Sequence, residues 1–266
     1  MWTRAISSLG LCALAFLSAC GGGERPDIKS ASIPPAAGIP AAFGDSDPHD
    51  WAGTTPARHQ VHGVDVSKWQ GPIDWTEAAR AGLQFVFVKA TEGGDRADPL
   101  FADHYDGARR AGLNVGAYHF YYHCTSAETQ ARWFIQNVPR RPGTLPPVLD
   151  IEFTPTSPTC RTPPAPEAVR DNIATFQRIV GAHYGTRPVI YTTVDFWEAN
   201  DLGRLNEEFW LRSVAGHPRE TYPGASWHFW QYTGTGRVPG VATDVDLNAF
   251  RGSAGEWQAW VNRRRQ

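Results

Sequence analysis

The feature that most constrains the fold of this chain is a regular alternation of strand-like and helix-like segments. Short apolar runs such as QFVFVKA are typical of buried parallel strands, and longer segments with capping residues separate them. The predicted strands are residues 61–67, 84–90, 114–121, 147–152, 187–192, 209–214, 227–233 and 245–250. The predicted helices are residues 74–82, 99–111, 126–138 and 167–184.

Repeated strand–helix units imply parallel strands joined by right-handed crossovers. Eight strands predict an α/β fold of the TIM-like β/α barrel type, and the scarcity of helix signals after residue 192 predicts that helices are depleted in the last third. A doubly wound open sheet is the structural alternative. No Gly-x-Gly-x-x-Gly follows the first strand, which counts against a dinucleotide-binding sheet.

The N-terminal residues are typical of an export signal. Arg4 precedes an apolar run over residues 6–19, which is short for a membrane span, and the run ends in Leu-Ser-Ala-Cys. This ending resembles a bacterial lipobox, so we expect residues 1–19 to be a lipoprotein signal peptide and Cys20 to be lipidated. The alternative is an ordinary signal peptide with an incidental cysteine. The resulting prediction is an exported protein anchored by lipid to a bacterial membrane, the outer membrane facing the periplasm.

Composition divides the rest of the chain. Residues 21–58 are rich in Gly, Pro, Ala and Asp without apolar periodicity, which predicts a flexible linker over residues 20–59. Residues 60–266 are long enough for one α/β domain. The net charge of −2 and the lack of a basic stripe argue against nucleic acid as a partner. We expect a monomer without a cofactor.

The cysteines outside the signal and the predicted lipid site form a single pair. Cys124 and Cys160 in an exported domain favour a disulfide, which would fix the proline-rich loop after the fourth strand. Two free thiols are the alternative. His119 and His123 precede Cys124, but the spacing is not that of a strong zinc motif, so we expect no metal site.

Acidic and polar residues fall repeatedly at predicted strand ends. Asp150 and Glu152 end the fourth strand two residues apart, so both project from the same face. Two neighbouring acids are costly to ionise together, which separates their pKa values as acid/base chemistry requires. The other residues at this predicted rim are Asp65, Lys89, Thr91, Glu92, Tyr118, Phe120, Tyr191, Gln231, Tyr232, Asp244 and Asp246. Because catalytic groups of parallel barrels gather at the carboxyl ends of the strands, the pattern predicts one catalytic site.

These motifs together resemble a known family. GVDVSKWQ (63–70), FVKATEG (87–93), GAYHF (116–120), LDIE (149–152), WQY (230–232) and VDLN (245–248) occur in the order found in glycoside hydrolase family 25, the Chalaropsis-type lysozymes. The resemblance covers about residues 61–250, and here it would be a member made as a bacterial lipoprotein. It implies a flattened β/α barrel with a depleted helical ring in its last third.

The resemblance also implies an activity and a site. The expected reaction is hydrolysis of the β-1,4 bond between N-acetylmuramic acid and N-acetylglucosamine in the glycan strands of peptidoglycan. Glu152 matches the general acid, and the assisting acids are Asp65, Asp150 and Asp246. The expected substrate-binding residues are Tyr118, Tyr191, Glu92, Trp230 and Gln231, of which Trp230 has a core position as its alternative. Arg212 departs from the usual family pattern and leaves the details of the subsites open.

Two other functions fit parts of the pattern. A chitinase-like barrel also ends its fourth strand in Asp-x-Glu, but it carries another Asp where this chain has Val148. A non-catalytic peptidoglycan-binding lipoprotein would be expected to have lost an acid, and all four acids are present.

Overall fold

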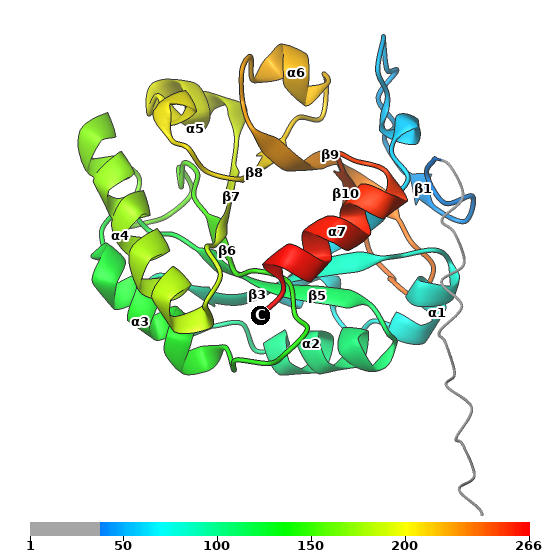
Figure 1. Cartoon of the computed structure of the whole chain (residues 1–266), viewed down its shortest axis with the longest axis horizontal. Helices are drawn as coiled ribbons and strands as arrows, with labels where there is room; N and C mark the ends of the chain where they lie inside the picture. Colours follow the sequence, from blue (N-terminus) through cyan, green and yellow to red (C-terminus); the bar gives the residue numbers. More distant parts are fainter. Residues whose placement is uncertain (1–37) are drawn as a thin grey trace, which may run out of the picture. The chain divides into compact units, whose positions relative to one another are not determined.

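The described part of the chain, residues 38–266 of a computed structural model, is built around a closed barrel of eight strands (Figure 1). Each strand pairs with the next, and the last pairs with the first, so the alternative of an open sheet is wrong. In order around the barrel the strands are β2 (His62–Val66), β3 (Phe85–Glu92), β5 (Asn114–Phe120), β6 (Val148–Asp150), β7 (Val189–Thr192), β8 (Phe209–Arg212), β9 (Trp227–Arg237) and β10 (Val245–Phe250).

The direction of β10 differs from the parallel arrangement that the repeat predicts. It runs antiparallel to both of its neighbours, β9 and β2, whereas every other pair of neighbouring barrel strands is parallel. The physical reason is the connection: residues 238–244 are too few for the crossover that a parallel strand needs. The N-terminal end of β10 therefore lies at the same rim as the C-terminal ends of the other strands.

The four predicted helices are present with ends that shift by a few residues: α1 (Trp75–Arg80), α2 (Phe101–Arg110), α3 (Ala127–Asn137) and α4 (Pro166–Tyr184). Their caps are the expected ones, since Asp74 accepts a hydrogen bond from the Glu77 amide at 2.9 Å and Ser126 accepts one from the Thr129 amide at 3.2 Å. Gly185 ends α4 in the left-handed conformation, with φ of 73°.

Three helices were not predicted from the sequence. They are α5 (Val194–Ala199), α6 (Pro218–Thr221) and α7 (Ala254–Arg264). The first two span only six and four residues, too few for a clear period of 3.6. The short elements β1 (Gly44–Asp45), η1 (Pro56–Arg58), η2 (Lys68–Gln70), β4 (Arg96–Ala97) and η3 (Leu202–Arg204) complete the described chain.

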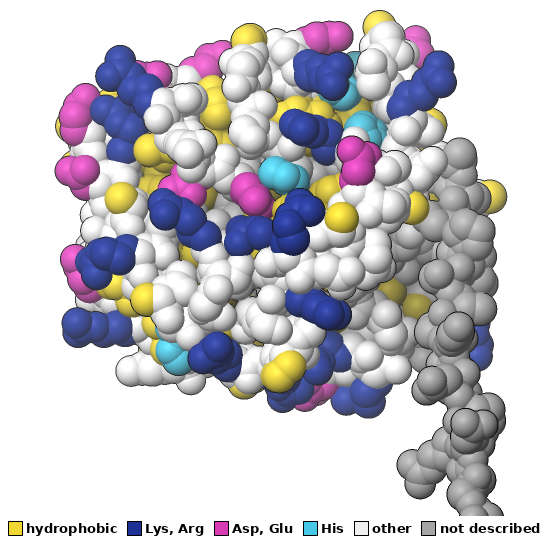
Figure 2. Space-filling view, in the orientation of Figure 1, with side chains coloured by type: hydrophobic (Ala, Val, Ile, Leu, Met, Phe, Trp, Pro, Cys, Tyr) yellow, Lys and Arg dark blue, Asp and Glu magenta, His cyan; other side chains and the backbone are white. Residues whose placement is uncertain are grey.

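The barrel interior is filled by aromatic side chains. Phe85, Phe87 and Phe229 are fully buried there, and α7 inserts Trp257 and Trp260 among the residues at the N-terminal ends of the strands. In Figure 1, α7 lies across the strands in front. The face seen from this side carries interspersed basic and acidic side chains (Figure 2). With one end filled and covered by α7, the opposite end is the one that can open to a ligand.

A second apolar layer lies between the strands and the helices. Leu149 and Ile151 face this layer, whereas Val148 packs inside the barrel, as strand alternation requires. His119 also faces outward, where its ring contacts the Thr91 hydroxyl at 2.7 Å and the Gln130 side chain at 3.0 Å. His119 is thus part of the packing between β5 and α3.

The predicted linker is too long at its C-terminal end. Residues 38–59 lie against the barrel: β1 pairs antiparallel with β9, and the Thr235 hydroxyl donates to Asp45 at 2.6 Å. Trp51 packs edge-on against Trp230, with ring centroids 5.2 Å apart. The reason is that β9 offers an edge to which a short strand can bind without any apolar repeat of its own. The signal peptide, Cys20 and residues up to 37 lie outside the described residues.

The two cysteines of the domain are joined. Cys124, after β5, and Cys160, in the loop after β6, form a disulfide with Cα atoms 5.6 Å apart. It fixes these neighbouring loops to each other at the open end of the barrel. Within residues 38–266, no helix has both the length and the apolar character needed to cross a membrane.

Candidate active site

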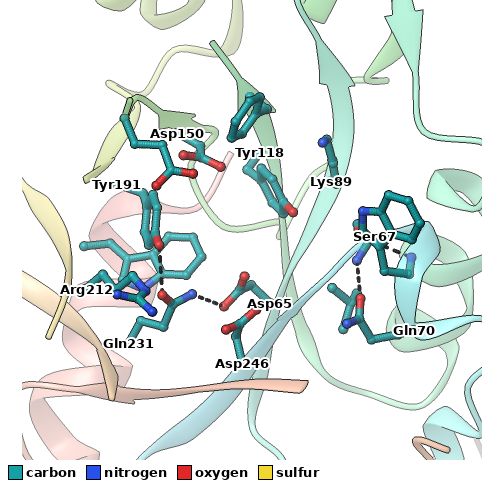
Figure 3. Close-up of a pocket in the computed structure, with 15 residues that line it drawn as sticks. Asp65, Ser67, Gln70, Lys89, Tyr118, Asp150, Tyr191, Arg212, Gln231 and Asp246 are labelled. Atoms are coloured by element: carbon teal, nitrogen blue, oxygen red, sulfur yellow. Dashed lines mark hydrogen bonds between the residues drawn. The ribbon is translucent and has the colours of Figure 1, made fainter. Parts of the chain in front are cut away.

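A cleft opens at the rim where the parallel strands end and β10 begins (Figure 3). Its cavity has a volume of about 280 Å³. All eight barrel strands contribute side chains to it. The lining residues are Asp65, Val66, Ser67, Trp69, Gln70, Lys89, Tyr118, Phe120, Asp150, Glu152, Tyr191, Trp210, Arg212, Gln231 and Asp246.

The structure brings all four predicted acids together. Asp65 on β2 and Asp246 on β10 are direct partners in the antiparallel ladder, so their side chains lie next to each other. Figure 3 shows these two carboxyl groups side by side, with Asp150 across the same cavity. Glu152, which follows β6, lines the cavity as well. The four acids are separated by up to 181 residues in sequence, and only closure of the barrel makes them one site.

Asp65 is held by two amide groups. Its Oδ1 accepts hydrogen bonds from Gln231 Nε2 at 3.0 Å and from Asn248 Nδ2 at 2.7 Å. Burial and then the charge of Asp246 raise the pKa of Asp65 well above its usual range, and the two amides oppose this shift. Burial also raises the pKa of Asp246 to about 6, against the lowering effect of Arg212.

The amide oxygens are themselves bound by donors. The Trp210 indole, which can only donate, binds Asn248 Oδ1 at 2.7 Å, and the Tyr191 hydroxyl donates to Gln231 Oε1 at 2.8 Å. The indole therefore requires Asn248 to turn its NH₂ group toward Asp65, and Gln231 also presents its NH₂ group to Asp65. This network holds the carboxyl group of Asp65 in one orientation.

Asp150 and Glu152 form the other half of the acid cluster. Asp150 is 8% exposed, and its Oδ1 is buried without a hydrogen-bond partner among the described residues. Burial and then the charge of Glu152 raise the pKa of Asp150 well above its usual range. A buried carboxyl oxygen without a partner inside a cleft is free to bind a polar group of a ligand.

Glu152 has the pKa of a group that can donate a proton near neutrality. Burial raises its pKa to about 7; Arg212 and Lys89 lower it, while Asp195 and Asp246 raise it. The charge of Glu152 in turn raises the pKa of the more deeply buried Asp150. Glu152 thus combines access to the cleft with partial protonation at pH 7.

Aromatic side chains surround the acids. Tyr118 and Tyr191 line the cleft at 8% and 7% exposure, and burial raises the pKa of both well above the usual range, so both hydroxyls stay protonated. Trp69, in η2, is 74% exposed at the rim. Its loop is fixed by a capping box in which Ser67 and Gln70 bind each other's backbone amides.

Two predicted substrate-binding residues lie outside this cleft lining. Trp230 is fully buried in the outer layer, where its indole donates to the Ser213 carbonyl at 2.7 Å, so its assignment to sugar stacking is wrong and the core alternative holds. The reason is alternation, because Gln231 faces the cleft and its neighbour must face away. Glu92 is also absent from the lining and instead pairs with Lys89 at 2.6 Å.

Several lining residues were not predicted to take part in catalysis or to bind substrate. Trp69, Phe120, Lys89 and Trp210 line the cleft directly, and Asn248 acts through Asp65. A signal existed for Phe120, which shares the face of Tyr118, and for Trp69, which lies in the DVSKWQ motif. Within residues 38–266, no three His, Cys, Asp or Glu side chains are grouped so as to hold a metal ion.

Fold and site together define a glycoside hydrolase: a closed β/α barrel with carboxyl groups and tyrosines gathered in one cleft. The sequence profile described as glycosyl hydrolases family 25 matches residues 64–241, and the chain belongs to this family.

Individual relatives match most of the chain. The chain is 38% identical to Lysozyme M1 of Streptomyces globisporus over 213 residues, which cover 76% of this chain and 71% of the relative. It is 36% identical to the protein YegX of Escherichia coli K12 over 212 residues, 78% of this chain and 75% of that protein. A solved family 25 glycosyl hydrolase from Bacillus anthracis superposes with a TM-score of 0.72 at 32% identity, covering 82% of this chain and 99% of that structure.

Proposed function

We propose that this glycoside hydrolase is a lysozyme, an N-acetylmuramidase that cleaves the β-1,4 bond between N-acetylmuramic acid and N-acetylglucosamine in peptidoglycan. The observation that carries the proposal is Glu152, a carboxyl group with a pKa of about 7 in a cleft with three other acids. The similarity to a protein named Lysozyme M1 supports the choice of substrate.

In this proposal Glu152 is the general acid. A pKa of about 7 leaves roughly half of Glu152 protonated at pH 7, against well under 1% for a glutamic acid with the usual value of 4.5. The proton goes to the glycosidic oxygen as its bond to the anomeric carbon breaks, which releases the neighbouring sugar as an alcohol.

The other acids act on the sugar that keeps the anomeric carbon. The free Oδ1 of Asp150 is placed to accept a hydrogen bond from the 2-acetamido group and to orient it toward that carbon. Asp65 and Asp246 stabilise the positive charge that develops on the sugar ring, or hold the water that attacks it. The hydrogen bonds from Gln231 and Asn248 keep the Asp65 carboxyl group in place for this role.

The aromatic residues would bind the glycan. Tyr118 and Tyr191 offer ring faces and hydroxyl donors inside the cleft, and Trp69 offers an exposed indole at its edge. We also infer that the barrel is flattened and that the connection between β8 and β9, which forms only the four-residue α6, leaves room for a polymer.

The anchor is a separate part of the proposal. The lipobox-like sequence before Cys20 supports a lipoprotein that is held on a membrane, the outer membrane facing the periplasm, and that works as a monomer. Radiolabelled palmitate supplied to cells expressing the full chain should label the wild type and not Cys20→Ser. Labelling of both, or of neither, would refute the anchor without touching the enzymatic proposal.

The activity is tested by identifying the new reducing ends. Purified peptidoglycan is digested, reduced with borohydride and hydrolysed, and the sugar alcohols are separated. Wild type should yield the alcohol of muramic acid, and Glu152→Gln should yield none above background. Glu128→Gln, which alters an exposed glutamate on α3, is the matched control and should behave as wild type. Glucosamine-derived alcohol, or no cleavage by any variant, would refute the proposal.

A further inference from the structure

Arg212 is a cation of the cleft that the proposed chemistry does not use. It ends β8, where Trp210 points into the barrel, Leu211 points outward, and Arg212 again faces inward. Figure 3 shows its guanidinium near Gln231, its partner in the β8–β9 register. Arg212 therefore lies on the same wall as the Gln231 amide that holds Asp65.

The two cations that line the cleft differ in what they bind. Lys89 already has partners within the protein: its Nζ pairs with Glu92 at 2.6 Å and lies 4.7 Å from the centre of the Phe120 ring. The Arg212 guanidinium makes no ion pair and no hydrogen bond with any residue from 38 to 266. Its five N–H groups are available to a ligand.

The charge of Arg212 does not favour the protonated form of Glu152, the proposed proton donor. Its charge lowers the pKa of both Glu152 and Asp246, so it lies within electrostatic range of both acids and makes Glu152 less protonated. A cation placed to assist proton donation would do the opposite. The charge is better explained by a partner that arrives with the substrate.

The backbone under Arg212 is rigid although its side chain is exposed. The Arg212 carbonyl accepts a hydrogen bond from the buried Tyr222 hydroxyl, and the next amide, of Ser213, donates to the Gln231 carbonyl at 3.0 Å. Because the backbone of Arg212 is already held, little backbone freedom is lost when its guanidinium binds a planar anion in a bidentate manner.

We propose that Arg212 is a specificity-determining residue that binds a carboxylate carried by the substrate next to the scissile bond. The inference rests on the proposed muramidase function, because muramic acid differs from glucosamine by a 3-O-lactyl group. Its carboxyl is free where the peptide has been removed, and otherwise it is amide-linked to a peptide that bears carboxylates of its own. A neutral glycan offers no such partner.

Three substrates separate these cases: peptide-free glycan with free lactyl carboxylates, the same glycan with its carboxyls converted to methylamides, and peptide-bearing glycan. Arg212→Gln should raise KM about tenfold on a carboxylate-bearing substrate, with a smaller change in kcat, and should not change KM on the amidated glycan. A loss confined to peptide-free glycan identifies the lactyl carboxylate, and a loss confined to peptide-bearing glycan identifies a peptide carboxylate. Arg212→Lys should recover part of the affinity, because it keeps the charge and loses the bidentate geometry.

Arg178→Gln is the matched control, since it removes an exposed guanidinium from α4, a helix that contributes no residue to the lining of the cleft. Equal KM values for wild type and Arg212→Gln on both carboxylate-bearing substrates would overturn the inference, as would an equal loss on the amidated glycan. Failure of the proposed function is recognised separately, because the wild type would then release no muramic acid ends. Calorimetric binding of the three glycans to Glu152→Gln, with and without Arg212→Gln, tests the carboxylate contact without turnover.

Discussion

Burial of Glu152 should make the folded protein less stable at alkaline pH than at acidic pH. The substitution Glu152→Gln should remove this contribution to the pH dependence of stability. The pKa of Glu152 rises from 4.5 to about 7 because the folded protein withdraws the carboxylate from water. The folded state thus binds this proton more tightly than the unfolded chain. Its contribution to stability is fully present below pH 4.5 and is lost as the pH rises through 7.

The size of the effect follows from the shift. About 2.5 units at 1.36 kcal/mol each is about 3.4 kcal/mol, and the partial exposure of Glu152 to the cleft reduces this to roughly 2 to 3 kcal/mol. Glu152→Gln keeps the shape and has no charge to bury. The variant should therefore gain roughly 2 to 3 kcal/mol over wild type on going from pH 4 to pH 9.

Urea unfolding followed by tryptophan fluorescence measures this difference, since the chain contains eleven tryptophans. Wild type and Glu152→Gln are compared at pH 4, 7 and 9, with Glu128→Gln as the control for the substitution itself. A difference between Glu152→Gln and wild type that stays constant from pH 4 to pH 9 would refute the assignment of a raised pKa to Glu152.

Three further outcomes are expected. Replacing both Cys124 and Cys160 by serine should lower the free energy of unfolding by about 3 to 4 kcal/mol, because the bond closes a loop with a sequence separation of 36; a change below 1 kcal/mol in the same urea assay would contradict this. Trp69→Ala should raise KM for glycan several-fold and leave kcat nearly unchanged, since the exposed indole binds sugar away from the acids; an unchanged KM would remove Trp69 from the binding surface. Arg212→Gln should move the alkaline limb of kcat/KM, set near pH 7 by Glu152, to higher pH because it removes a cation that lowers this pKa; a limb that moves to lower pH would contradict the electrostatics.

The sequence was sufficient for the barrel and its acids because both depend on local periodicity. Each of the eight strands is an apolar run that the structure reproduces within a few residues, and Asp65, Asp150 and Asp246 all lie at the predicted rim. The direction of β10 was not predictable from the pattern of its own residues, since the short connection from β9 decides it. The antiparallel turn nevertheless brings Asp246 to Asp65, because a reversed strand presents its beginning where the others end.

What the sequence did not provide is the pairing of distant residues. Residues 38–59 have no apolar repeat, yet Gly44 to Ser46 bind the edge of β9 through backbone hydrogen bonds that any sequence can make. Trp230 and Gln231 are adjacent, and only the face that β9 turns to the barrel decides which of them meets the substrate. The amide network around Asp65 links five strands and follows from closure alone.

The central claim is that Glu152 protonates the leaving oxygen, and a substrate that needs no such proton tests it most directly. Glu152→Gln should lose about 10³-fold in kcat/KM on a natural glycan linkage. It should lose far less on a muramic acid glycoside with a 2,4-dinitrophenolate leaving group, which departs without protonation. An equal loss on both substrates would contradict the assignment of Glu152 as the general acid.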